Sequence, residues 1–175
     1  MFQSVILISV PSADPIISKW RKKYDKVVLH GIPSHITLLF PFKEPSQITQ
    51  KIIQQLENIF SGVKQFPFVL DRINMFPNVI FLDPNPRDEF IKLTEAIVRV
   101  FPENPPYEGK YESINPHTTI AAELSGIEQT DSLKKQIELD ISRSFPIHCV
   151  AKEAWLMIED EKGEWNIQSK FPFLL

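Results

Sequence analysis

Apolar residues recur along this chain at two different spacings, and segments of the two kinds alternate. Short runs rich in β-branched residues, such as "SVILISV" near the start, are typical of β-strands. Longer segments carry an apolar residue at every third or fourth position, which predicts helices with one buried face. The helices are predicted at 14–24, 46–60, 88–101 and 127–142.

The predicted strands lie between these helices and after the last of them. They cover residues 2–10, 35–42, 66–76, 79–82, 117–124, 145–159 and 164–173. The dipeptide "PN" at 77–78 and the tetrapeptide "DEKG" at 160–163 are turn signals, so each is expected to join two neighbouring strands. The chain is therefore expected to contain both strands and helices.

Each half of the chain follows the order strand, helix, loop, strand, helix, strand. The first helices of the two halves begin at Asp14 and Asp88, 74 residues apart, whereas His35 and His117 are 82 residues apart. The second half has therefore gained eight residues (82 − 74), and they fall in the loop at 102–116. We expect a single domain over 1–175 with two pseudo-symmetric lobes, whose sequence repeats are approximately 1–76 and 77–175.

A histidine begins one predicted strand in each half, in "HITL" and in "HTTI". Because side chains alternate along a strand, His35 and Thr37 should project from one face, and His117 and Thr119 should do likewise. The opposite faces are predicted to carry Ile36, Leu38 and Phe40 in the first strand and Thr118, Ile120 and Ala122 in the second. A pseudo-two-fold axis between the halves would place the two imidazole–hydroxyl pairs across a shared groove.

Such a groove has the groups needed to cleave a phosphodiester. A neutral imidazole can take a proton from the attacking oxygen while a protonated one gives a proton to the leaving oxygen, since the ordinary histidine pKa is near 6.5. Threonine hydroxyls can donate hydrogen bonds to the non-bridging oxygens of the phosphate. A lone histidine at a strand start is more often structural, and we interpret His30 and His148 in that way. The equivalent placing of the other two favours a function.

Both histidine segments match the H-x-T-hydrophobic motif of the 2H phosphoesterase superfamily, the 2′-5′ RNA ligase-like proteins, and the element order of the whole chain resembles that family. The resemblance implies a bilobal duplicated α+β fold of two antiparallel-rich sheets, with helices outside and a central cleft. It also implies cyclic phosphodiesterase, 2′,5′-RNA ligase or RNA end-trimming chemistry. By this resemblance His35 and His117 are the catalytic residues and Thr37 and Thr119 bind the phosphate; which histidine is the base stays open.

The long loop before the second motif offers further candidates for substrate binding. Tyr107 and Tyr111 could stack on a base, and Lys110 could meet a terminal phosphate. Packing of the two tyrosines against the adjacent strands is the simpler alternative.

Composition limits the partners and the location of the protein. A net charge of −3 does not indicate a basic face for long nucleic acids, so we expect a substrate the size of a nucleotide or an RNA terminus. The apolar runs are much shorter than the roughly 20 residues of a membrane span, and the chain starts without a signal-peptide pattern. With one cysteine, no disulfide can form within the chain. We expect a cytoplasmic protein, without a membrane partner and with a monomer as the default state.

The sequence shows no Walker loop, no G-x-G-x-x-G, no H-E-x-x-H and no C-x-x-C, so no cofactor and no metal is expected. The leading hypothesis is a metal-independent phosphoesterase acting on 2′,3′-cyclic phosphates or 2′,5′-phosphodiesters of RNA or nucleotides, with hydrolysis favoured over ligation. The alternative is a non-catalytic module that binds a nucleotide or an RNA end in the same cleft. A purely structural role of both histidines is the third hypothesis.

Overall fold

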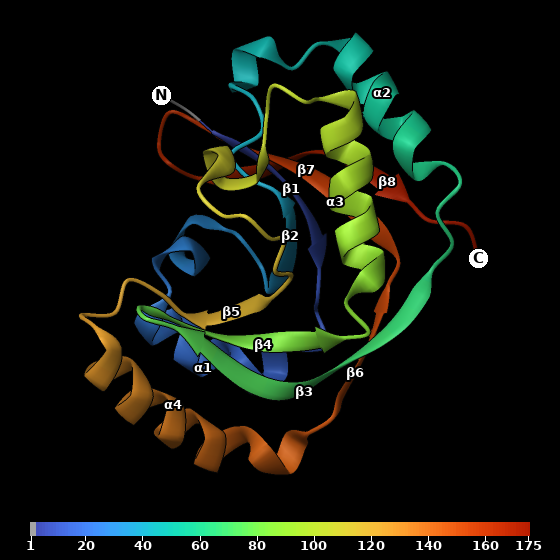
Figure 1. Cartoon of the computed structure of the whole chain (residues 1–175). Coiled ribbons are helices and arrows are strands. Elements are labelled where there is room, and N and C mark those ends of the chain that lie inside the picture. The colour runs from blue at the N-terminus through green and yellow to red at the C-terminus, as the bar shows by residue number, and fades with distance from the viewer. Residues whose placement is uncertain (1–2) are drawn as a thin grey trace.

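The alternating strands and helices form two four-stranded antiparallel sheets with helices packed against them (Figure 1). The computed structural model describes residues 3–175, so Phe2, where the first strand was predicted to begin, lies outside the described residues. The first sheet has the order β2-β1-β7-β8 and the second has the order β5-β4-β3-β6. The predicted α+β class with two antiparallel sheets is confirmed.

The first sheet combines strands from both ends of the chain: β1 (Ser4–Ser9), β2 (His35–Leu39), β7 (Glu153–Glu159) and β8 (Trp165–Pro172). The second sheet is made of β3 (Phe66–Phe76), β4 (Val79–Asn85), β5 (Thr118–Ala121) and β6 (Ile147–Ala151). The α-helices are α1 (Asp14–Tyr24), α2 (Gln50–Phe60), α3 (Asp88–Val100) and α4 (Ile127–Ile141). Three-residue to five-residue 3₁₀ turns cover Lys26–His30, Pro45–Gln47, Pro106–Gly109 and Ser142–Ser144.

The two sheets are arranged as pseudo-symmetric copies of each other. In the first sheet β1 lies between β2 and β7, and in the second β4 lies between β5 and β3. The helix after each central strand crosses to the other sheet, α1 to β5 and α3 to β2, while α2 packs on β8 and α4 on β3. The sheets therefore exchange elements: β3 of the first half lies in the second sheet, and β7 and β8 of the second half complete the first sheet. The two sequence repeats, 1–76 and 77–175, share an order of elements, but each sheet contains strands from both repeats.

Several strand ends differ from the predicted ones by a few residues, as in β4, which continues to Asn85, and two elements differ more. The second helix begins at Gln50 and not at residue 46, because Ile48 is extended (ψ 93°) and packs against the core after the turn at Pro45–Gln47. The predicted strand 145–159 is two strands, β6 and β7, which separate at Lys152 and join different sheets. The phase of burial changes at the same point, since Ile147, Cys149 and Ala151 are buried before it and Ala154 and Leu156 after it.

A β-bulge interrupts each histidine strand directly after its threonine. Thr37 pairs with Leu7 and Leu39 with Ile6, so Leu38 is an extra residue on β2. Thr119 pairs with Phe81 and Ala121 with Ile80, so Ile120 is the corresponding extra residue on β5. A bulge reverses the alternation of the residues that follow it.

The bulges make part of the predicted face assignment wrong. Phe40, predicted on the face of Ile36 and Leu38, packs instead with a small cluster of Val5, Leu7, Ile32 and Met157. Leu39 takes its place in the main core. In β5 Ala121, and not Ala122, is fully buried beside Ile120.

The main core lies between the helices and one face of each sheet. The small cluster around Leu7 lies on the other face of the first sheet, which also carries Thr37, because directly paired residues of antiparallel strands share a face. That face of the first sheet consequently carries both apolar side chains and the polar side chain of Thr37.

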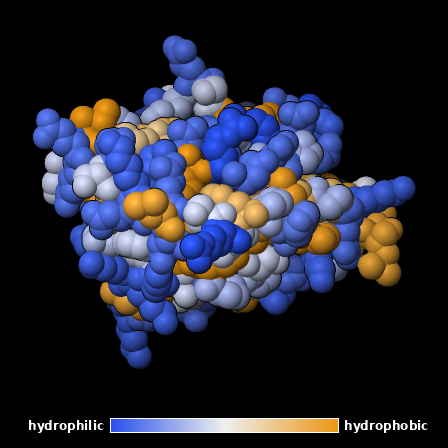
Figure 2. All heavy atoms as spheres, turned by 90° about the horizontal axis from the view of Figure 1, so that it is seen from below, coloured by the Kyte–Doolittle hydropathy of each residue, from blue (hydrophilic) through white to orange (hydrophobic). Residues whose placement is uncertain are grey.

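The surface seen from below is mainly hydrophilic, with hydrophobic residues in separate patches (Figure 2). Within residues 3–175, none of the helices has both the length and the apolar character that crossing a bilayer requires.

Candidate functional site

The first histidine is held in place by its own strand. His35 pairs with Ser9 of β1, and its Nδ1 lies 2.8 Å from the carbonyl oxygen of Pro33. A carbonyl oxygen only accepts hydrogen bonds, so Nδ1 carries the proton and Nε2 of the neutral ring keeps a free lone pair. The side chain is half-buried.

The second histidine is held in the same way. The Nδ1 of His117 lies 2.7 Å from the carbonyl oxygen of Asn115, again two residues earlier in the chain. The rings of Phe76 and Phe81 pack against the imidazole at centroid distances of 5.5 and 5.0 Å. The His117 ring is also half-buried, so neither imidazole is sealed inside packed hydrocarbon. Each Nε2 is thus the nitrogen available for a substrate.

The histidine strands β2 and β5 approach each other where the two sheets meet. Burial lowers the pKa of His35 to about 4, and the nearby positive charges of Arg21 and His117 act in the same direction. Burial also lowers the pKa of His117, while the carboxylate of Asp83 acts in the opposite direction. The contacts between β2 and β5 and the influence of His117 on the His35 pKa indicate that the two imidazoles share one region, with Thr37 and Thr119 two residues further along each strand.

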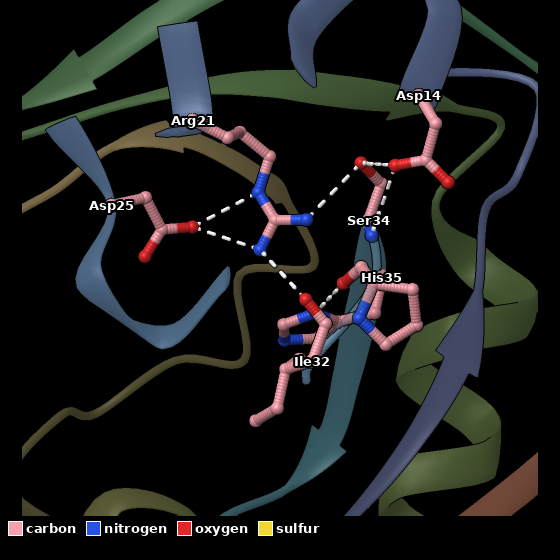
Figure 3. A network of polar contacts seen from close by, with 7 residues as sticks. Asp14, Arg21, Asp25, Ile32, Ser34 and His35 are labelled. Carbon is pink, nitrogen blue, oxygen red and sulfur yellow. Dashed lines mark hydrogen bonds and ion pairs between the residues drawn. The ribbon is translucent and has the colours of Figure 1, made fainter. Parts of the chain in front are cut away.

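A buried polar network supports the segment before His35 (Figure 3). Arg21 of α1 is 1% exposed and forms an ion pair with Asp25 at 2.8 Å. Its guanidinium also donates to the Ser34 hydroxyl at 3.2 Å and to the Ile32 carbonyl at 3.4 Å. Asp14 accepts from the backbone N–H of Ser34 and from its hydroxyl. The network fixes the chain direction into β2 and places a buried positive charge near His35.

A second network supports His117 but has the opposite charge beside the ring. Asp83 pairs with β3 at Arg72 and accepts hydrogen bonds from Arg87 at 3.0 Å and from Asn74 at 3.2 Å. Arg87 also donates to the Asn115 side chain at 3.0 Å, and the Asn115 backbone carbonyl holds His117. The registers make Asp83 the counterpart of Ser9, since each lies two residues after the partner of a motif threonine. The two imidazoles therefore have unequal surroundings.

The loop residues predicted to bind substrate differ in their positions. Tyr107 is half-buried, lies near Thr37, and donates its backbone N–H to the Phe40 carbonyl at 2.7 Å. Its ring packs edge-on against Tyr111, and both line a cavity of about 380 Å³ together with Thr37. Tyr107 and Glu108 have left-handed backbone angles (φ 51° and 57°), which cost energy in non-glycine residues.

The third loop candidate, Lys110, lies away from this cavity. Its ammonium group pairs with Glu108 at 2.6 Å, and both side chains are exposed. The structure thus brings Tyr107 and Tyr111 to Thr37 and leaves Lys110 at the surface.

Two further cavities lie next to the strands that pair with the histidine strands. One of about 620 Å³ includes Ser9, Pro33, Glu153 and Trp155. Another of about 360 Å³ lies along β3 and β4 and includes Asp83, Arg72 and Arg87. Sequence reasoning missed Asp83, Arg87 and Trp155 because only the pairing of distant strands brings them to the histidines. Within the described part of the chain, no group of three or more histidine, cysteine, aspartate or glutamate side chains is arranged to hold a metal ion.

Comparison with known proteins agrees with this architecture. The sequence profile of the 2′-5′ RNA ligase superfamily matches residues 9–163, and the chain belongs to this family. A Bacillus licheniformis protein named "Putative phosphoesterase" is 25% identical over 175 residues, which is 98% of each chain. A Bacillus cytotoxicus protein with the same kind of name is 28% identical over 154 residues, covering 86% of this chain and 84% of the relative.

Solved structures with the same fold include Escherichia coli LigT in complex with 3′-AMP, with a TM-score of 0.61 and 16% identity over 99% of this chain and 98% of LigT. A protein of Thermus thermophilus has a TM-score of 0.62 and 15% identity over 98% of this chain and 97% of its own. These structures confirm the fold of the 2H phosphoesterases, and the relatives identify the chain as a superfamily member of the phosphoesterase kind.

Proposed function

We propose that this protein hydrolyses 2′,3′-cyclic phosphates or 2′,5′-phosphodiesters of nucleotides or RNA ends, with His35 and His117 as the acid–base pair. The observation that carries the proposal is the matched anchoring of the two imidazoles. Each Nδ1 is bound to the carbonyl two residues earlier, at 2.8 and 2.7 Å, which leaves both Nε2 atoms free where β2 and β5 meet. Two free ring nitrogens on one phosphate suit in-line displacement.

For a 2′,3′-cyclic phosphate, the steps follow from the charges beside each ring. Neutral His35 takes a proton from water as the water oxygen forms a bond to phosphorus. The bond from phosphorus to one ribose oxygen breaks, and protonated His117 gives its proton to that oxygen. The buried Arg21 favours the neutral form of His35, whereas Asp83 favours the charged form of His117. The hydroxyls of Thr37 and Thr119 stabilise the non-bridging oxygens.

Nucleotides are the substrate class that the comparisons favour. Structures of E. coli LigT, which shares the fold, contain 3′-AMP, NADP⁺ and ATP. The cavities of about 620 and 380 Å³ beside the histidine strands fall in the usual range of small-molecule sites. We propose a nucleotide or the terminus of an RNA as the substrate, acted on in the cytoplasm by a monomer without a metal cofactor.

The test is hydrolysis of nucleoside 2′,3′-cyclic phosphates and 2′,5′-linked dinucleotides, with phosphorus NMR to locate the product phosphate. His35→Ala and His117→Ala should each lower turnover by about 10²–10⁴-fold, because each removes one proton-transfer group. His30→Ala is the matched control, since His30 is exposed and its Nδ1 lies 3.9 Å from the Glu164 carboxylate, away from the histidine strands. Chelator should leave the activity unchanged. Binding without turnover of any substrate would favour the non-catalytic module instead.

A further inference from the structure

A cavity of about 620 Å³ is lined by two residues that contact His35, and the proton-transfer groups do not explain it. Ser9, which pairs with His35, and Pro33, whose carbonyl holds the imidazole, both line it. Strand β6 of the second sheet supplies His148 and Val150, and β7 supplies Glu153 and Trp155. The cavity therefore begins at the end of β1, next to the segment that leads into β2, and extends to β6 and β7.

Trp155 faces the same side of the sheet as the motif residues. Trp155 pairs with Leu7, and Leu7 pairs with Thr37, so the three side chains share one face. Neighbouring strands are about 4.8 Å apart, which puts the backbone of Trp155 about 10 Å from that of Thr37. That separation is comparable to the distance between the phosphate and the base in a nucleotide.

The indole of Trp155 is held in a fixed orientation. Its Nε1 donates to the Glu153 carboxylate at 2.5 Å, and the Lys170 ammonium lies 4.5 Å from the ring centroid. Lys170 also approaches Glu153 at 3.4 Å but does not line the cavity. Trp155 and the adjacent Glu153 line the cavity, so an aromatic side chain and a carboxylate border it together.

We propose that this cavity is a nucleobase subsite, in which the base of the substrate stacks on Trp155 while its phosphate lies between the histidines. Glu153 and Ser9 provide acceptors for the hydroxyl or amino groups of the bound nucleoside. The inference rests on the proposed function and adds to it that the substrate must carry a base on the His35 side of the phosphate.

The first experiment compares adenosine 2′,3′-cyclic phosphate with methyl riboside 2′,3′-cyclic phosphate, which has the same reacting ring and no base. Trp155→Ala should raise KM for the adenosine compound by about 10-fold to 100-fold, the range set by one base–aromatic stacking contact. KM for the compound without a base should change by less than about 3-fold, and Trp155→Phe should nearly preserve both values because phenylalanine also stacks. Equal effects of Trp155→Ala on the two compounds would overturn the subsite.

The second experiment measures binding without turnover, so that it decides the matter even if no substrate is cleaved or the alanine variant does not fold. Adenosine 3′-monophosphate should quench the fluorescence of the wild-type protein, which has three tryptophans. Trp155→Phe should remove the quenching while calorimetry still detects the nucleotide. Trp20→Phe is the control, since Trp20 lies on α1 against Tyr24 and Asp140, and the quenching in this variant should equal that of the wild type.

Full quenching in Trp155→Phe, or no nucleotide binding to the wild type, contradicts the subsite. Absence of turnover with intact quenching contradicts only the proposed reaction.

Discussion

The two candidate catalytic histidines differ in the charges that surround them, although their backbones are related by pseudo-symmetry. A buried arginine lies near His35, and a carboxylate lies near His117 at the position equivalent to Ser9. A positive neighbour favours the neutral imidazole, and a negative neighbour favours the protonated one. On the basis of these unequal neighbours we propose His35 as the base and His117 as the acid.

Asp83→Asn tests this direction through the pH profile. An acid must be protonated, so activity falls as pH rises through the pKa of His117. Asp83 raises that pKa, and its removal should therefore move the alkaline limb of kcat/KM to lower pH. Measurement of kcat/KM against pH in the wild type and in Asp83→Asn checks the shift. An unchanged alkaline limb, or one moved to higher pH, would remove His117 from the role of acid.

The pKa of His35 also predicts how the free energy of unfolding depends on pH. This pKa is lowered in the folded state to about 4, below its ordinary value near 6.5. The unfolded chain therefore binds the proton more readily between these values, and the free energy of unfolding should decrease as pH falls from about 6.5 to about 4. Urea unfolding across this range measures the decrease. The slope should be smaller in His35→Gln, and an equal slope in both proteins would show that other groups cause it.

At the scale of elements, hydrogen bonds join α1 to the segment that leads into the histidine strand β2. Arg21 is 1% exposed and bridges Asp25, Ser34 and Ile32, so the start of β2 depends on a residue of a helix that packs on the other sheet. Removing one partner of a buried ion pair leaves the other without compensation for its lost hydration.

Arg21→Ala should therefore destabilise the protein by about 3–5 kcal/mol in urea unfolding. The Arg21→Ala/Asp25→Ala double variant should lose less than the sum of the single variants, because it leaves no unpaired carboxylate. Lys19→Ala is the control, since the Lys19 side chain is 63% exposed in its pair with Asp140 and such pairs contribute about 1 kcal/mol or less. Additive losses in the double variant would contradict the proposed coupling.

The spacing of apolar residues predicted the positions of the helices and strands better than it predicted which strands pair. Helices α1, α3 and α4 begin where their apolar spacing places them, and both histidine strands were recognised from the order of elements and the short motif. The bulges at Leu38 and Ile120 could not be predicted, because a bulge is a property of two paired strands. The same reason hid Trp155 and Asp83, which reach the site only through the pairing of β7 with β1 and of β4 with β5.

At the scale of the whole molecule, the two halves depend on each other for their sheets. In the first sheet β1 and β2 come from the start of the chain, but β7 and β8 come from its end, and β3 is paired with β4 and β6 of the second half. A fragment of residues 1–76 should consequently remain unfolded by circular dichroism and NMR dispersion, and mixing it with 77–175 should restore structure. Cooperative unfolding of the isolated fragment 1–76 would contradict this interdependence.

The central claim is that both imidazoles act on the same phosphorus atom. Turnover of a nucleoside 2′,3′-cyclic phosphate by the wild type, His35→Ala, His117→Ala and the double variant tests it most directly, because groups that act as a unit have non-additive effects. We predict a loss of about 10²–10⁴-fold in each single variant and little further loss in the double variant, with all four proteins folded. Wild-type turnover in either single variant would contradict the claim, as would a double-variant loss equal to the product of the single losses.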